Sequence, residues 1–114
     1  MKFAILAYES PAEFEARNDA ARCGRYWGEW AAFGQSLKMA GIVSAMHGFG
    51  QPALARTIRV AAGKAAVETG PMQATTPQLG GYFIIEVAAE EEAVNWAAKC
   101  PAARDGAVEI RPVL

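Results

Sequence analysis

Two hydrophobic patterns alternate along the chain, and each predicts its own kind of secondary structure. Short runs that are continuously apolar, or that alternate apolar with polar residues, are typical of β-strands when Gly, Pro or Ser bounds them. Such runs cover residues 2–8, 42–46, 54–60, 65–68, 81–87 and 107–113. Ala62-Gly63-Lys64 separates the third run from the fourth and predicts a tight hairpin turn between them.

Helical patterns occupy the remaining segments. Ser10 precedes Pro11, and Glu13 follows Ser10 by three residues, so the sequence predicts a capping box at a helix start. Apolar residues then recur at helical spacing from residue 27 to residue 37, and Gly41 predicts the stop. Gly24 and Gly28 predict a kink or a break, or a close approach between helix and sheet. A second helix is expected over residues 90–99, ended by Pro101.

The order β-α-β-(hairpin)-β-α-β predicts the fold class. It indicates one α+β domain over residues 1–114, a ferredoxin-like β-α-β-β-α-β sandwich with an inserted hairpin. Both helices would cover one face of an antiparallel sheet and leave the other face bare. We therefore expect a homodimer in which a second copy of the sheet covers that face.

Composition and charge narrow the class of protein. The chain has 114 residues, of which 53% are hydrophobic, and a formal net charge of −1, which argues against nucleic-acid and polybasic membrane contacts. Glu9 interrupts the first apolar run too early for a signal peptide, and no run is as long as a membrane span. Cys23 and Cys100 belong to no metal or redox motif, so free thiols and a cytoplasmic location are expected. We expect seven large side chains to anchor the core: Trp27, Trp30, Phe33, Phe49, Tyr82, Phe83 and Trp96.

Several segments taken together resemble a known family. The segments are Thr69-Gly70-Pro71-Met72 and residues 1–8, 40–43, 78–86, 93–103 and 106–113. In this order they resemble the YCII-related proteins, and specifically the branch named for an Asp-Gly-Pro-Phe (DGPF) motif. The resemblance implies a dimeric α/β-barrel fold. It also implies a largely undefined biochemical role. Members of the branch often appear beside sigma factors of the extracytoplasmic type, which hints at a regulatory role. Relatives in the wider superfamily act on small organic molecules, sometimes without a cofactor.

The motif itself is altered in this chain. Thr69 stands where the branch has Asp, and Met72 stands where it has Phe. Residues 73–77 replace the usual acidic and basic positions, whereas Gln78 and the following Leu-Gly-Gly are retained. The loop over residues 69–81 is therefore the first candidate site, with Thr69, Gly70, Pro71 and Gln78 as binding residues. The alternative is a structural loop that leads into the next strand.

Three other side chains could carry chemistry. His47, the only histidine, lies between glycine-rich segments and could act as a general acid or base, or it could be an exposed strand-end residue. Tyr8 and Glu9 end the first strand and could donate a hydrogen bond and serve as a base; alternatively, Tyr8 packs at the core edge and Glu9 begins the helix entry. Glu109 and Arg111 share one strand face and could form an ion pair.

These features favour a small-molecule-binding or regulatory module without established catalysis, and with no cofactor or metal. The alternative is a cofactor-independent enzyme that acts on a small organic substrate in a cleft between the sheet and its loops. Loss of the motif Asp favours the first interpretation, and a lone histidine beside a glycine-rich bend favours the second.

Overall fold

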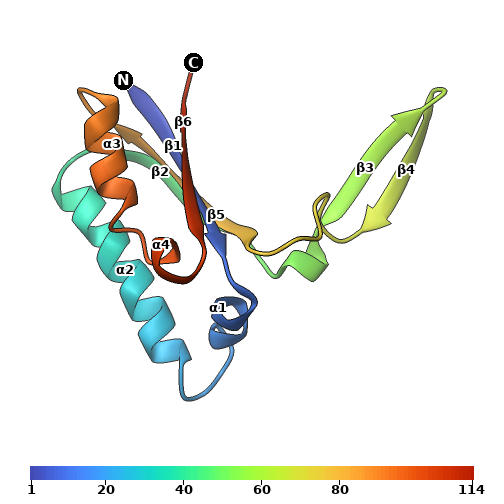
Figure 1. Cartoon of the computed structure of the whole chain (residues 1–114), viewed down its shortest axis with the longest axis horizontal. Helices are drawn as coiled ribbons and strands as arrows, with labels where there is room; N and C mark the ends of the chain where they lie inside the picture. Colours follow the sequence, from blue (N-terminus) through green and yellow to red (C-terminus); the bar gives the residue numbers. More distant parts are fainter.

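A four-stranded antiparallel sheet forms the centre of the molecule (Figure 1). The computed structural model describes residues 1–114. The strands are β1 (Lys2–Glu9), β2 (Val43–Gly48), β5 (Gln78–Glu86) and β6 (Ala107–Pro112), in the order β2-β5-β1-β6. The two central strands, β1 and β5, are the continuously apolar runs of the sequence. This order and the α+β composition confirm the predicted ferredoxin-like fold.

One face of the sheet carries the helices. These are α1 (Pro11–Ala16), α2 (Cys23–Met39), α3 (Glu90–Ala97) and α4 (Ala102–Asp105). Along β1 the side chains alternate, because successive residues of a strand point to opposite faces. Phe3, Ile5 and Ala7 are buried in a core with residues of α2, α3 and α4, whereas Leu6 and Tyr8 on the opposite, open face are half-buried. None of the helices combines the length and apolar character needed to cross a membrane.

The first helical region divides at a different place from the expected one. The Ser10 hydroxyl accepts the Glu13 N–H at 3.3 Å, which confirms the predicted cap of α1. The break then falls between Ala16 and Cys23, so the prediction of a break near Gly24 and Gly28 is wrong. Asp19 explains this position, because its carboxylate accepts the N–H groups of residues 21 and 22 at 3.0 Å and forms a local turn.

The core anchors differ in part from the expected set. Phe33 and Phe83 are buried, but Trp27 is 52% exposed and Phe49 is 40% exposed, so the expectation is wrong for these two. The indole of Trp27 donates to the backbone carbonyl of Arg17 at 3.1 Å and lies at the surface of α2. The remaining aromatic core is supplied by Phe3, Phe14 and Tyr26.

The inserted hairpin forms a separate two-stranded sheet of β3 (Arg56–Ala61) and β4 (Lys64–Thr69). We call residues 56–69 the arm. A 3-10 helix, η1 (Pro52–Leu54), precedes it. The arm projects from the body on the side of the sheet away from α2 and α3 (Figure 1). Its two-residue turn has positive φ at Ala62 (51°) and Gly63 (76°), which is the geometry of a type I′ hairpin turn.

Candidate functional site

A buried ion pair lies where β1 ends. Glu9 is only 2% exposed, and its Oε2 lies 2.9 Å from Nη2 of Arg17. The hydroxyl of buried Tyr26 donates to the other carboxylate oxygen of Glu9, and Nε of Arg17 donates to that hydroxyl at 2.8 Å. A buried carboxylate is tolerated only when it is paired and hydrogen-bonded, and these contacts meet both conditions.

Arg17 also connects separate segments of backbone. Its Nη1 donates to the carbonyl of Phe49, and its Nη2 donates to the carbonyl of Gly80 at 3.2 Å. The glycine is required here, because a Cβ at residue 80 would lie 1.7 Å from Oε2 of Glu9. One guanidinium therefore fixes the start of the α1–α2 connection, the end of β2 and the irregular start of β5 relative to one another.

The protonation of Tyr26 follows from this environment. Burial raises the pKa of Tyr26 well above its usual range, and the hydrogen bond to the Glu9 carboxylate raises it further. Tyr26 therefore stays protonated and keeps donating to Glu9. No buried side-chain nitrogen or oxygen in the molecule lacks a hydrogen-bond partner, so the Glu9–Arg17–Tyr26 cluster is internally satisfied.

A groove of about 830 Å³ borders this cluster, between α2 and the edge strand β2. We call it the α2 groove. Trp30 and Phe83 stack in its wall with ring centroids 6.0 Å apart and an interplanar angle of 7°. Its lining includes Arg17 and Lys38 but no Asp or Glu. The lining residues are Arg17, Tyr26, Trp27, Trp30, Ala31, Gly34, Gln35, Lys38, Met46–Gly50, Gly81 and Phe83.

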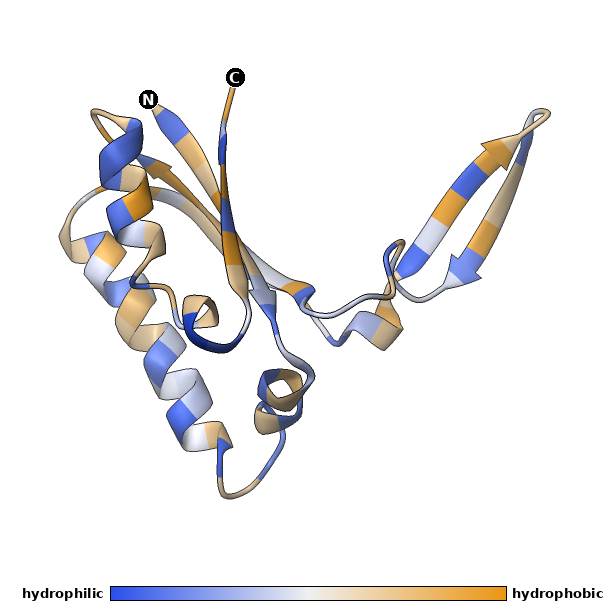
Figure 2. Cartoon of the chain, in the orientation of Figure 1, coloured by the Kyte–Doolittle hydropathy of each residue, from blue (hydrophilic) through white to orange (hydrophobic).

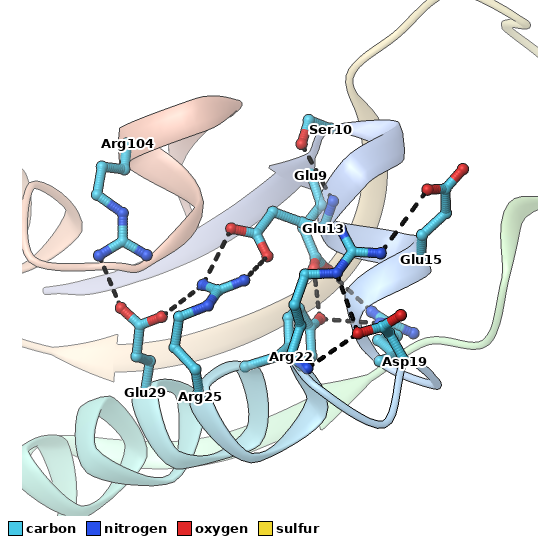
Figure 3. Close-up of polar contacts among 11 residues, drawn as sticks. Glu9, Ser10, Glu13, Glu15, Asp19, Arg22, Arg25, Glu29 and Arg104 are labelled. Atoms are coloured by element: carbon cyan, nitrogen blue, oxygen red, sulfur yellow. Dashed lines mark hydrogen bonds and ion pairs between the residues drawn. The ribbon is translucent and has the colours of Figure 1, made fainter.

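A surface ion-pair network holds α2 in place beside the buried cluster (Figure 3). Arg25 lies between Glu13 of α1 at 2.9 Å and Glu29 at 2.7 Å, and Arg104 of α4 lies 2.7 Å from Glu29. The hydrogen bond from Arg104 lowers the pKa of Glu29, and the hydrogen bond from Arg25 lowers that of Glu13. These pairs connect three helices, although exposed pairs of this kind contribute little stability individually.

The structure brings some of the sequence-predicted residues together. Glu9, Pro71 and Gln78 line one cavity of about 400 Å³ next to η1. In it, the amide of Gln78 donates to the carbonyls of Gln73 and Thr75, both at 2.6 Å, and so holds the loop that precedes β5.

The other predicted residues lie elsewhere. Thr69 ends β4, and Gly70 closes the base of the arm by donating its N–H to the carbonyl of Ala55 at 2.8 Å. Tyr8 lies on the open face of the sheet, where its hydroxyl donates to Glu109 at 3.3 Å, and burial together with Glu109 raises its pKa. His47 borders the α2 groove, but its ring lies 5.6 Å from that of Tyr82, a residue of the open face of the sheet. Thr69 lines neither this groove nor the cavity next to η1.

Sequence analysis missed the two partners of Glu9. Alternation along β1 places Glu9 on the same face as Phe3, Ile5 and Ala7, and a carboxylate on that face requires a cation. That signal could have led to Arg17, the first arginine after the helix start, but nothing in the local sequence pattern singles out Tyr26. No group of three or more His, Cys, Asp or Glu side chains lies close enough together to hold a metal ion.

Together, these features define a ferredoxin-like α+β domain with a ligand-sized groove between its long helix and a sheet edge. The chain belongs to the YCII-related domain family, whose model matches residues 1–114. No curated protein sequence matches the chain significantly. The family prediction is thus confirmed, and membership of the DGPF branch stays a prediction.

Proposed function

We propose that the protein binds a small ligand in the α2 groove and does not catalyse its conversion. The ligand would consist of a planar, apolar ring system that carries one negative charge. The observation that carries this proposal is the groove itself. Its volume of about 830 Å³ lies within the range typical of small-molecule sites, and its wall is largely aromatic and apolar. A flat ring system suits a wall that contains Trp27, Trp30 and Phe83.

The sign of the ligand's charge follows from the polar groups of the groove. Arg17 and Lys38 are its permanent cations, and no carboxylate lines it. The ion pair with Glu9 neutralises Arg17, so Lys38 is the cation left to attract an anion. A single carboxylate or comparable negative group on the ligand would pair with Lys38.

The absence of turnover is supported by the hydrogen bonding of the buried cluster. Glu9, Arg17 and Tyr26 satisfy one another, so none offers a free proton or lone pair to a ligand without rearrangement. The alternative, a cofactor-independent enzyme, draws support only from the position of His47, which borders the groove although its ring lies against Tyr82 on the open face of the sheet.

Binding is tested by calorimetric titration with 2-naphthoate and its uncharged analogue 2-naphthamide. Ala31→Trp places an indole in the groove, whereas Ala32→Trp changes the next position of the same helix, which does not line it. We expect the wild type and Ala32→Trp to bind naphthoate and Ala31→Trp to lose binding. Equal binding by both variants would contradict the proposal.

Charge selectivity is tested with the same two ligands. Lys38→Gln is expected to remove the preference for naphthoate over naphthamide, which we put at about two- to fivefold for one exposed ion pair. Lys99→Gln is the control, because Lys99 lies over the Trp96 ring and outside the groove. His47→Ala is expected to bind naphthoate like the wild type, and a loss of binding would show that His47 belongs to the binding site.

We also propose that the protein is a cytoplasmic homodimer. The open face of the sheet carries half-buried apolar side chains, including Leu6, Tyr82 and Ile84, which no element of the same chain covers. A second copy of the chain is the simplest cover, since most oligomers are symmetric assemblies of one chain. The unpaired thiols of Cys23 and Cys100 support a reducing compartment. Light scattering should give twice the 12.1 kDa mass of the chain, and a monomer at micromolar concentration would contradict the dimer.

A further inference from the structure

The α2 groove follows one side of α2 for about three turns. Residues spaced three or four apart lie above one another on a helix, and the lining contains such a series, Trp27, Trp30, Gly34 and Lys38. At about 1.5 Å per residue, Trp30 and Lys38 are about 12 Å apart along the helix axis. Polar and apolar residues alternate along α2 in short bands (Figure 2), so a ligand that follows the groove meets more than one kind of surface.

The end of the groove near the start of α2 is aromatic. Tyr26 and Trp27 pack edge to face with ring centroids 4.8 Å apart, and Trp30 continues this surface toward the sheet by stacking on a phenylalanine of β5. Arg17 is the cation at this end, where its carbonyl accepts the indole N–H of Trp27, and Glu9 neutralises it. This end therefore suits an uncharged ring.

The opposite end of the groove carries the free charge. Lys38 lies there in the last turn of α2, is exposed, and forms none of the ion pairs of the structure. Long side chains of a helix point back toward its start, so the ammonium group reaches toward Trp30 by about one turn, or about 5 Å. An anion paired with Lys38 would then lie about 7 Å from Trp30 along the helix axis.

Gly34 lies between these two ends. It is buried, and a Cβ at this residue would lie 3.3 Å from Sδ of Met46 and 3.6 Å from its Cε. A side chain here would therefore narrow the groove between its aromatic end and its charged end. The opposite wall is the unbranched thioether of Met46, which adapts readily to an apolar chain.

We infer that the ligand is an aryl alkanoate, with its ring at Trp27 and Trp30, its saturated chain over Gly34, and its carboxylate at Lys38. This inference rests on the proposed function and specifies the class of ligand. An extended chain advances about 1.2 Å per bond, so a span of about 7 Å takes about six bonds, or five methylene groups. A compact acid such as 2-naphthoate spans the two ends only in part and should bind more weakly.

Chain length is tested by calorimetric titration with phenylacetate, 4-phenylbutanoate, 6-phenylhexanoate and 8-phenyloctanoate, each beside its uncharged amide. Burial alone strengthens binding by roughly fourfold per methylene, and it does so equally for acids and amides. We expect the preference for acid over amide to be largest for 6-phenylhexanoate, at about two- to fivefold, and to disappear there in Lys38→Gln. A preference that is equal at all four chain lengths would overturn the inference.

The path of the chain is tested with two matched glycine substitutions in α2. Gly34→Leu fills the space beside Met46 and should weaken 6-phenylhexanoate binding by at least about tenfold. Gly28→Leu is the control, because Gly28 does not line the groove and no atom lies within 4 Å of its added Cβ. Unchanged binding by Gly34→Leu would overturn the inference. If that variant fails to fold, Gly34→Ala replaces it, with an expected loss of about threefold.

The outcomes separate this inference from the proposed function. If neither 2-naphthoate nor any phenylalkanoate binds, the proposed function and the inference fail together. If 2-naphthoate binds as proposed but the phenylalkanoates show no optimum of charge preference, only the inference fails. Binding of 6-phenylhexanoate that is at least about tenfold tighter than that of 2-naphthoate, and is lost in Gly34→Leu, would support both.

Discussion

At the residue scale, the most constrained position is the carboxylate of Glu9. Its burial is tolerated because Arg17 and Tyr26 both contact it, and the same guanidinium reaches two backbone carbonyls. Removing one partner of a buried pair typically costs about 3–5 kcal/mol, because an uncompensated charge is left inside. The cluster therefore holds β1, the α1–α2 connection and β5 together.

The glycine under this carboxylate gives a direct test. Gly80→Ala would place a Cβ 1.7 Å from Oε2 of Glu9 and 2.6 Å from its Cδ, so the buried carboxylate must move. We expect the free energy of unfolding, measured by urea denaturation, to fall by about 3 kcal/mol or more. Gly28→Ala is the control: no atom lies within 4 Å of its added Cβ, and a helix interior should gain about 0.5–1 kcal/mol. Equal effects of the two substitutions would show that the Glu9 carboxylate can move aside at little energetic cost.

The two cysteines give a second test at this scale. Burial raises the pKa of Cys100 to about 11, so almost none of it is thiolate at pH 8, and its sulfur is also shielded. Cys23 is partly exposed at the start of α2. Alkylation by iodoacetamide, followed by peptide mass spectrometry, should label Cys23 in the native protein and Cys100 only after denaturation. Rapid labelling of native Cys100 would contradict its place in the core.

At the element scale, sequence patterns predicted those parts of the fold that local chemistry determines. The Ser10 cap, the hairpin turn at residues 62–64 and the central strands each have a local signal, and each is confirmed. The second half of the predicted capping box is absent, because the Glu13 carboxylate pairs with Arg25 and not with the N–H of Ser10. The helix α4 was missed because four residues are too few to produce a periodic pattern. Trp27 was misplaced because helical spacing does not show which side of α2 borders a groove.

The candidate site was harder to predict for a related reason. Glu9 could be selected from its place at a strand end, but its partners Arg17 and Tyr26 come from a loop and from α2, and only tertiary packing brings them together. The α2 groove likewise joins residues of α2, β2 and β5 that share no sequence motif. The altered motif at residue 69 pointed instead to the base of the arm.

The turn of the arm carries a prediction at the same scale. Ala62 has φ of 51°, a left-handed conformation that costs a residue with a Cβ about 1–2 kcal/mol and that Asn tolerates better. Ala62→Asn should therefore slow amide hydrogen exchange throughout β3 and β4 by about tenfold. Gly63→Ala, at φ of 76°, should accelerate the same exchange. No change in either direction would mean that the turn does not limit opening of the hairpin.

At the scale of the whole molecule, the arm and the body are nearly independent structures. The molecule measures 47 × 41 × 19 Å, and the arm extends well beyond the helices and the central sheet (Figure 1). All twelve residues of the core cluster belong to the body, and none belongs to residues 56–69. The core packing that stabilises the body therefore does not include the arm.

This independence predicts that the arm can be removed without unfolding the body. The N–H of Gly70 and the carbonyl of Ala55 lie 2.8 Å apart, so a short Gly-Ser linker can replace residues 56–69 without moving either end. The arm supplies no core residue, and the linker keeps the chain continuous from η1 to β5. The shortened chain should therefore keep its helical circular dichroism and a cooperative thermal unfolding transition. It should also keep the affinity of the α2 groove for 2-naphthoate, since no arm residue lines that groove. Loss of the cooperative melt would show that the body needs the arm in order to fold. Retained folding with lost naphthoate binding would show instead that the arm shapes the groove from a distance.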